Sequence, residues 1–330
     1  MFNKLYAFFK DNRKEIIIFI ALMALFTIRL PYYVDSPGGT ISLKKKLQIE
    51  NTKEINGDIS LVYVAERPGT IPSLLISLFS KDWDIIKKED IELSNEDARD
   101  VEARGKVTLN QGINTAIVYA FKKAGKDIEI LANKIYTVYV LENAKTDMKV
   151  GDQILMIDNQ KISSREDIHD YIETLNVGDQ VSIKVLNDGK EYIRSATIIS
   201  EDGKKMVGIM STIIYDYKLS QEVKYENKSS EMGSSGGFAN TLYIYSSLID
   251  EDIIKGRKII GTGTIDSDGN IGEIGGLKYK LKAANLSGAS IFFVPQDNCE
   301  EGNKLKKENK YDLNLVCIKT FDDAIDYLKK

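Results

Sequence analysis

Two short stretches of the chain hold residue types that could do hydrolytic chemistry. A pair of serines lies in the glycine run 233–237, and Lys280 lies in a predicted helix within 275–284. Glycines let the backbone turn sharply and let a substrate approach main-chain N–H groups. Residues 238–248 have the apolar spacing of a helix, and the N–H groups at a helix start stabilise a developing oxyanion. These stretches predict a nucleophile and a candidate base.

The order of residues along the chain restricts what the base can be. The run Gly233-x-Ser235-x-Gly237 fits the nucleophile elbow of α/β-hydrolases, in which the histidine follows the serine. The only histidine here, His169, precedes the serine, so a Ser-His-Asp triad in that order is excluded. A lysine kept neutral by desolvation is the known substitute for histidine, which makes Lys280 the candidate.

On these residues, the segment 231–296 resembles the proteolytic domain of Lon-type Ser-Lys proteases. The family's Gly-Pro-Ser-Ala-Gly run corresponds to Gly-Ser-Ser-Gly-Gly here, which places the family's nucleophile on Ser235 rather than Ser234. The family's lysine falls on Lys280, in Lys-Leu-Lys-Ala-Ala, and the serine and lysine are 45 residues apart (280 minus 235).

The resemblance also implies roles for the neighbouring residues. It implies that Thr262 supports the dyad by hydrogen bonding to the lysine amine or to the serine hydroxyl. It places the oxyanion turn at Gly233, Ser234 and Gly236, with the N–H group of Ser235 as the main donor. The dyad needs no cofactor and no metal ion.

A second resemblance covers the middle of the chain. The phrase Val-Gly-Asp-x-Ile-Leu at 150–155, with a turn at Asp158-Asn159, resembles PDZ domains of bacterial proteases, and we place this domain at 126–200. Such domains bind extended peptides by strand addition, and the resemblance implies a peptide-binding strand. Its residues are Ile135, Tyr136, Thr137, Val138 and Tyr139. The preceding loop lacks a glycine-rich carboxylate-binding pattern, so a free C-terminus and an internal segment both remain open as ligands.

The N-terminal residues have the pattern of a membrane anchor. A basic flank at 1–15 is followed by mainly apolar residues at 16–34. At about 1.5 Å per residue, 19 helical residues would extend about 28 Å, close to the thickness of a hydrocarbon core. No small-x-small cleavage site follows, which favours a retained transmembrane signal anchor over a cleaved signal peptide. The positive-inside rule then leaves the N-terminus in the cytoplasm and the later domains outside the cell.

These parts predict an α+β fold with an N-terminal transmembrane helix. A helix is expected at 112–125, just before the PDZ segment. In Lon-type domains a similar helix lies just before the strand that leads to the serine. We therefore expect the PDZ domain, a small β-rich sandwich with helices, to interrupt a Lon-type proteolytic domain. Its first part would be the extracellular segment 35–125 and the rest 201–330. The whole arrangement resembles the membrane-anchored PDZ–Lon-like proteases of Gram-positive bacteria.

Composition and missing motifs narrow the classes of function. The net charge of −4 and the absence of a basic stripe with aromatic residues argue against nucleic-acid binding. No G-x-x-x-x-G-K-[ST] run is present, so we expect no nucleotide partner, and no C-x-x-C or H-E-x-x-H motif indicates a metal. Cys299 in an expected loop and Cys317 in an expected strand could pair in an oxidising compartment. The oligomeric state stays open.

Three functions remain. The main expectation is an ATP-independent, membrane-anchored serine endopeptidase that cleaves extracellular or membrane-proximal peptides or proteins selected by the PDZ domain. The first alternative is a catalytically inactive Lon-like scaffold that acts as a PDZ peptide-binding adaptor, and the second is a hydrolase of esters or lipids. The peptidase requires Lys280 to have a lowered pKa, which burial near Ile274, Leu277, Leu281 and Ala284 would provide.

Overall fold

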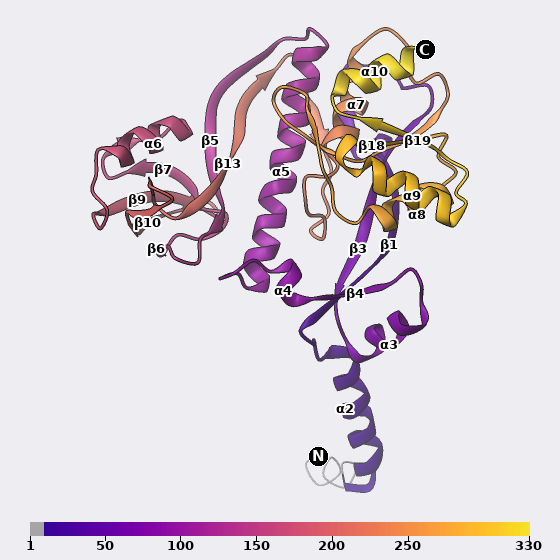
Figure 1. Cartoon of the computed structure of the whole chain (residues 1–330), viewed down its shortest axis with the longest axis horizontal. Coiled ribbons are helices and arrows are strands. Elements are labelled where there is room, and N and C mark those ends of the chain that lie inside the picture. Colours follow the sequence, from indigo (N-terminus) through magenta and orange to yellow (C-terminus); the bar gives the residue numbers. More distant parts are fainter. Residues whose placement is uncertain (1–9) are drawn as a thin grey trace, which may run out of the picture. The chain divides into compact units, whose positions relative to one another are not determined.

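The chain has a mixed α+β fold in a computed structural model that describes residues 10–330 (Figure 1). These residues form two compact units. The smaller contains the residues up to Gly38 together with Val64–Ile91, and the larger contains Gly39–Tyr63 and Glu92–Lys330.

The smaller unit contains two helices with apolar sequences and a two-stranded ladder. Its elements are α2 (Arg13–Thr27), most of β1 (Tyr32–Ser42), the end of β3 (Asp58–Pro68), α3 (Ile71–Phe79), β4 (Asp84–Lys87) and α4 (Lys88–Ile91). Strands β1 and β4 pair antiparallel, with Tyr32 opposite Lys87 and Asp35 opposite Asp84.

The N-terminal expectation needs correction in this unit. The segment 16–34 does not form one helix, because α2 ends at Thr27 and the chain is already extended in β1 from Tyr32. Residues 35–39 also lie in β1. Within residues 10–330, no helix is both long enough and apolar enough to cross a membrane. The basic flank at 1–15 lies mostly outside the described residues.

The larger unit contains four parallel strands in the order β19-β18-β15-β3. The further elements here are β15 (Lys258–Gly261), β18 (Ile291–Pro295), β19 (Asn314–Ile318), α7 (Gly237–Leu248), α8 (Leu277–Leu286), α9 (Cys299–Asn309) and α10 (Phe321–Lys329). Successive residues of β15 face opposite sides: Ile259 packs in the cluster that contains α7, and Ile260 packs in the cluster that contains α8. Helices therefore cover both faces of these strands, as parallel strands require.

Helix α5 (Ala98–Lys123) joins segments that are distant in sequence. It packs against α7, and its apolar residues share one core with residues that lie before β3 and after the PDZ segment. The expected helix at 112–125 is therefore only the second half of α5. The first half is highly charged, so apolar spacing did not reveal it. Asp97, whose side chain accepts hydrogen bonds from the N–H groups of Arg99 and Asp100, caps its start.

The PDZ segment has its own sheet and its own apolar core. Its elements are β5 (Ile128–Val140), β6 (Lys145–Thr146), β7 (Gln153–Ile157), β8 (Gln160–Lys161), α6 (Arg165–Glu173), β9 (Gln180–Asn187), β10 (Lys190–Thr197), β11 (Ile199–Glu201), β12 (Lys204–Met206) and β13 (Ile209–Leu219). The sheet order is β13-β5-β7-β9-β10-β6. In the Val-Gly-Asp phrase, Asp152 is fully buried and accepts hydrogen bonds from Arg194 and Asn187, so this aspartate is structural.

Short strands complete the larger unit. They are β2 (Leu47–Ile49), which pairs with β14 (Val223–Tyr225), and β16 (Thr264–Ile265), which forms a hairpin with β17 (Ile271–Gly272). Figure 1 shows β5 and β13 as two long strands side by side.

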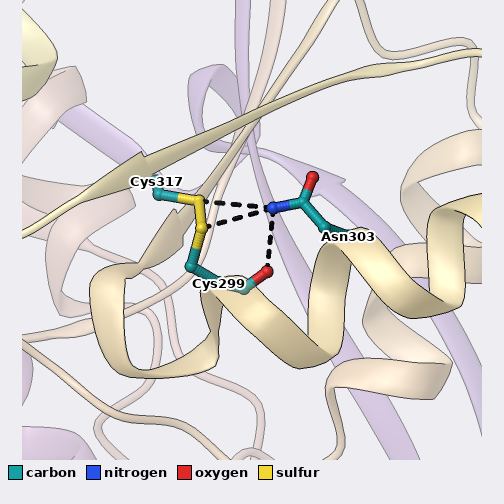
Figure 2. Close-up of a disulfide and its surroundings, with 3 residues drawn as sticks. All are labelled: Cys299, Asn303 and Cys317. Atoms are coloured by element: carbon teal, nitrogen blue, oxygen red, sulfur yellow. Dashed lines mark hydrogen bonds between the residues drawn. A yellow bond between two sulfur atoms is a disulfide. The ribbon is translucent and has the colours of Figure 1, made fainter.

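A disulfide joins Cys299 to Cys317, with 5.6 Å between the Cα atoms and 18 residues of sequence separation. Cys299 begins α9 rather than lying in a loop, and Cys317 lies in β19. The side-chain amide of Asn303 donates to the carbonyl oxygen of Cys299 at 3.0 Å and also lies beside the sulfur atoms (Figure 2). The disulfide therefore links α9 covalently to β19.

Replacing both cysteines with serine should lower the free energy of unfolding by about 3 kcal/mol, because a loop of this length restricts the unfolded chain by about that amount. Urea denaturation followed by circular dichroism would measure the change. Wild-type protein in reducing buffer should shift to the same midpoint. An unchanged midpoint in the double variant would mean that the bridge does not form in solution.

Candidate active site

The serine turn lies immediately before α7, and its conformation depends on glycine. Gly233 has a φ of +86°, a value that side-chain-bearing residues rarely adopt, and its N–H group donates to the carbonyl oxygen of Gly105 at 2.9 Å. The turn then presents Ser234 and Ser235 at the N-terminal end of α7, which begins at Gly237.

Helix α5 supports this turn from the other side. A Cβ atom added to Gly112 would lie 3.1 Å from the Cα atom of Ser234, so the turn packs directly on the α5 backbone. Gly105 and Gly112 are two helical turns apart and therefore lie on one face of α5. Sequence reasoning missed this support, although two glycines at that spacing in a helix were a usable signal of close packing.

Two backbone N–H groups at the turn are available to a substrate. Within residues 10–330, the N–H groups of Ser235 and Gly236 donate no hydrogen bond. The next two are used, because Gly237 donates to the carbonyl of Ser234 at 2.9 Å and Phe238 donates to the carbonyl of Gly263 at 3.0 Å. Free N–H groups at the positive end of a helix favour a developing negative charge.

Thr262 is fully buried just after β15 and contacts the serine turn. Its hydroxyl donates to the backbone carbonyl of Ser235 at 3.3 Å, and the same carbonyl accepts from the N–H group of Gly263 at 2.8 Å. The expected partners were the lysine amine or the serine hydroxyl, so this detail differs. Thr262 instead fixes the main chain of the serine residue.

Lys280 lies on the buried face of α8 and is only 4% exposed. Ile274, Leu277, Leu281 and Ala284, expected to surround it, are all buried as well. This burial lowers the pKa of Lys280 to about 8, which confirms the expected direction. In the part of the chain that the structure describes, the Lys280 side chain makes no hydrogen bond or ion pair.

Strand β15 lies between helix α8, which carries Lys280, and helix α7, which follows Ser235. Leu277 and Leu281 on α8 pack in one cluster with Ile260, two residues before Thr262. No hydrogen bond joins Lys280 to Ser235 or Thr262 among residues 10–330. Helix α7, which follows the serine turn, and helix α8, which carries the lysine, thus pack on opposite faces of β15, which ends just before Thr262.

A buried ion pair that sequence reasoning missed fixes the chain before the serine turn. The ammonium of Lys46 lies 2.6 Å from a carboxylate oxygen of Glu231 and donates to the carbonyl of Glu226 at 2.7 Å. It also lies 5.1 Å from the centre of the Tyr225 ring. The partners are 185 residues apart, so no local pattern could have indicated the pair.

Lys46→Met should destabilise the protein by about 3 kcal/mol, because it leaves the Glu231 carboxylate buried without its partner. Thermal or urea unfolding would measure the loss. Lys44→Met is the matched control: Lys44 pairs with Glu54, which is 84% exposed, and an exposed pair contributes little. Equal effects of the two substitutions would contradict the assignment.

Where the expected peptide-binding strand enters the PDZ sheet, neighbouring strands already pair with both of its edges. In β5, Ile135 lies opposite Ile213 of β13 and opposite Ile154 of β7. Thr137 lies opposite Ser211, whose carbonyl accepts a hydrogen bond from Arg165 at the start of α6. A peptide could therefore pair with Ile135–Tyr139 only if β13 moved away. The exposed His169 on α6 forms no part of a cluster with the serine or lysine.

A hollow of about 320 Å³ lies between α5 and the strands β5 and β13. Its lining includes Ile113, which follows the Gly112 that contacts Ser234, and Asn227, on the segment that leads to the serine. The remaining lining residues are Val107, Asn110, Asn114, Tyr136, Ile214 and Tyr217. None of these side chains carries a charge at neutral pH.

Comparison with known proteins identifies the middle of the chain. Residues 117–196 match the PDZ domain family. Two PDZ domains of SdrC-like proteins each align with about a quarter of this chain and with 92% of their own. The one from Listeria monocytogenes is 24% identical with a TM-score of 0.23, and the one from Listeria innocua is 30% identical with a TM-score of 0.22.

Other relatives are proteases that match only in part. A Lon protease of Aster yellows witches'-broom phytoplasma is 35% identical over 28% of this chain and 11% of its own length. A Lon protease of Acinetobacter baumannii is 26% identical over 53% of this chain and 20% of its own length. A putative zinc metalloprotease of Borreliella burgdorferi is 27% identical over 44% of this chain and 35% of its own.

The chain thus spans only about a tenth to a third of the length of these relatives. The similarity to Lon proteases is distant, and one of these relatives is named as a putative zinc metalloprotease. Within residues 10–330, no group of three or more His, Cys, Asp or Glu side chains is arranged to hold a metal ion.

Proposed function

We propose that the protein is a serine endopeptidase in which Ser235 is the nucleophile and Lys280 is the general base. The proposal depends mainly on the burial of Lys280. Its side chain is 4% exposed, and its pKa is lowered to about 8. An ordinary lysine has a pKa near 10.4 and is almost wholly protonated at neutral pH. A buried lysine without a partner lowers the stability of the folded protein. Its presence therefore indicates a function, and a lysine with a lowered pKa can act as a general base.

The proposed reaction follows from the groups at the turn. Lys280 takes the proton from the Ser235 hydroxyl as the serine oxygen bonds to the peptide carbonyl carbon. The N–H groups of Ser235 and Gly236 donate to the carbonyl oxygen as it becomes negative. Lys280 then returns the proton to the leaving amine, and water hydrolyses the acyl-enzyme by the same route. The hydrogen bond between lysine and serine forms in the substrate complex, where catalytic contacts tighten.

The surroundings also support a location. We also propose that the chain is attached to a membrane through its apolar N-terminal segment and lies on the extracellular side, since the Cys299–Cys317 disulfide supports an oxidising compartment. The PDZ segment would select the peptide once β13 moves away from β5.

A fluorophosphonate probe tests the nucleophile. We expect wild-type protein to be labelled, Ser235→Ala to lose labelling and peptide cleavage, and the matched control Ser234→Ala to keep most of both. Labelling lost in Ser234→Ala and kept in Ser235→Ala would show that the nucleophile is misassigned. If neither wild-type nor variants react, the second candidate is favoured, a PDZ adaptor without catalysis, which the family match over 117–196 supports.

A further inference from the structure

Helix α3 has its polar and apolar faces in the reverse of the usual arrangement. Its serines point toward the protein: Ser77 is 7% exposed and donates to the carbonyl of Ser73 at 2.9 Å, and Ser73 forms the N-terminal capping box with Thr70. The large apolar side chains point outward, and Leu75, Ile76, Leu78 and Phe79 are 53%, 52%, 69% and 89% exposed. A helix in contact with water on its outer face has the opposite pattern.

Helix α2 continues this apolar surface within the same unit. None of the α2 residues is buried, and α2 contacts α3. Two backbone hydrogen bonds join the segment after α2 to the segment before α3. The N–H group of Leu30 donates to the carbonyl of Gly69 at 2.8 Å, and the N–H group of Gly69 donates to the carbonyl of Tyr32 at 2.7 Å. The exposed apolar residues from α2 to its C-cap are Ile17, Ile18, Phe19, Ile20, Leu22, Met23, Leu25, Phe26 and Ile28.

The distribution of these side chains indicates what covers them. A protein partner covers one side of a helix, whereas a bilayer covers all sides, and α2 is apolar around its whole circumference. Basic residues lie at both ends, with Arg13 and Lys14 beside Glu15 at the start and Arg29 just beyond the C-cap, which suits anionic headgroups. A contiguous exposed apolar surface of this kind marks an interaction site.

We infer that α3 is a second membrane-contacting element, which inserts its Leu75–Phe79 face into the boundary between headgroups and acyl chains of an anionic bilayer that α2 enters. Short amphipathic helices bind in this plane through their apolar face. The inference rests on the proposed membrane location and is independent of the proposed peptidase activity.

The chain has a single tryptophan, Trp83, which allows a direct test with the full-length protein. In the test variant, Phe79→Trp with Trp83→Phe moves that tryptophan onto the α3 face. In the control, Ile193→Trp with Trp83→Phe moves it to an apolar residue of the PDZ segment that is 66% exposed. Each would be reconstituted in vesicles of phosphatidylcholine and phosphatidylglycerol, with and without brominated acyl chains.

We expect bromination to reduce emission of the test variant by about twofold or more and to leave the control unchanged, because only residues at the acyl boundary meet the bromine atoms. Equal emission with both lipids in the test variant overturns the inference. So does cross-linking of two copies through Phe79→Cys, which would make the face an interface between copies.

Vesicle flotation separates the two proposals. If the full-length chain does not float with the vesicles, the membrane inference fails, and probe labelling of Ser235 is unaffected. If the chain floats and the test variant is quenched while Ser235 stays unlabelled, the membrane inference holds and the peptidase proposal fails.

Discussion

Lys280→Arg should abolish peptide cleavage, while cleavage by the wild-type protein should rise about tenfold between pH 7 and pH 9. The pKa of Lys280 is about 8, so the neutral amine that accepts the serine proton is a minor species at pH 7 and the main one at pH 9. A guanidinium keeps its proton throughout this range and cannot act as the base. Initial rates on a fluorogenic peptide, measured across this pH range, would record both effects.

Lys282→Arg is the control for this experiment, because Lys282 lies on the same helix but is only half-buried. It should keep the activity and the pH profile of the wild-type protein. A fully active Lys280→Arg variant would refute the dyad. A wild-type rate that is flat from pH 7 to pH 9 would mean that the proton moves to some other group.

The local part of the site could be predicted from the sequence, because its signals are local. A serine among glycines before a helix, and a lysine flanked by Leu277 and Leu281, are patterns within ten residues, and the structure buries the lysine as expected. The PDZ segment was predicted for the same reason, since its Val-Gly-Asp phrase lies in one short run.

The contacts that hold the site in place could not be predicted from short sequence patterns. The Lys46–Glu231 pair and the contact of Gly112 with Ser234 join residues more than a hundred positions apart. The pairing of β5 with β13 also depends on how the chain returns from the PDZ segment, and it occupies the edge that we expected a peptide to use. Local apolarity likewise predicted a helix through Val34, whereas pairing with β4 makes that residue part of a strand.

Lys280→Met should make the protein more stable while removing its activity. In the folded protein the pKa of Lys280 is about 8, against a usual value of 10.5, so burial of its charge opposes folding. A difference of this size corresponds to about 3 kcal/mol at pH 7. Methionine has a similar shape without the charge, and we expect it to recover about 1–3 kcal/mol of that cost in urea unfolding at pH 7.

The pH dependence of the gain distinguishes this cause from better packing. Between about pH 8 and pH 10.5 the unfolded chain holds a proton on Lys280 that the folded protein has lost, so wild-type stability should rise with pH across this window. The advantage of Lys280→Met should therefore shrink over the same window, while Lys282→Met shows no such trend. If Lys280→Met destabilises the protein at pH 7, the lysine ammonium is satisfied in the folded state. The observation that carries the proposed catalytic dyad would then be lost.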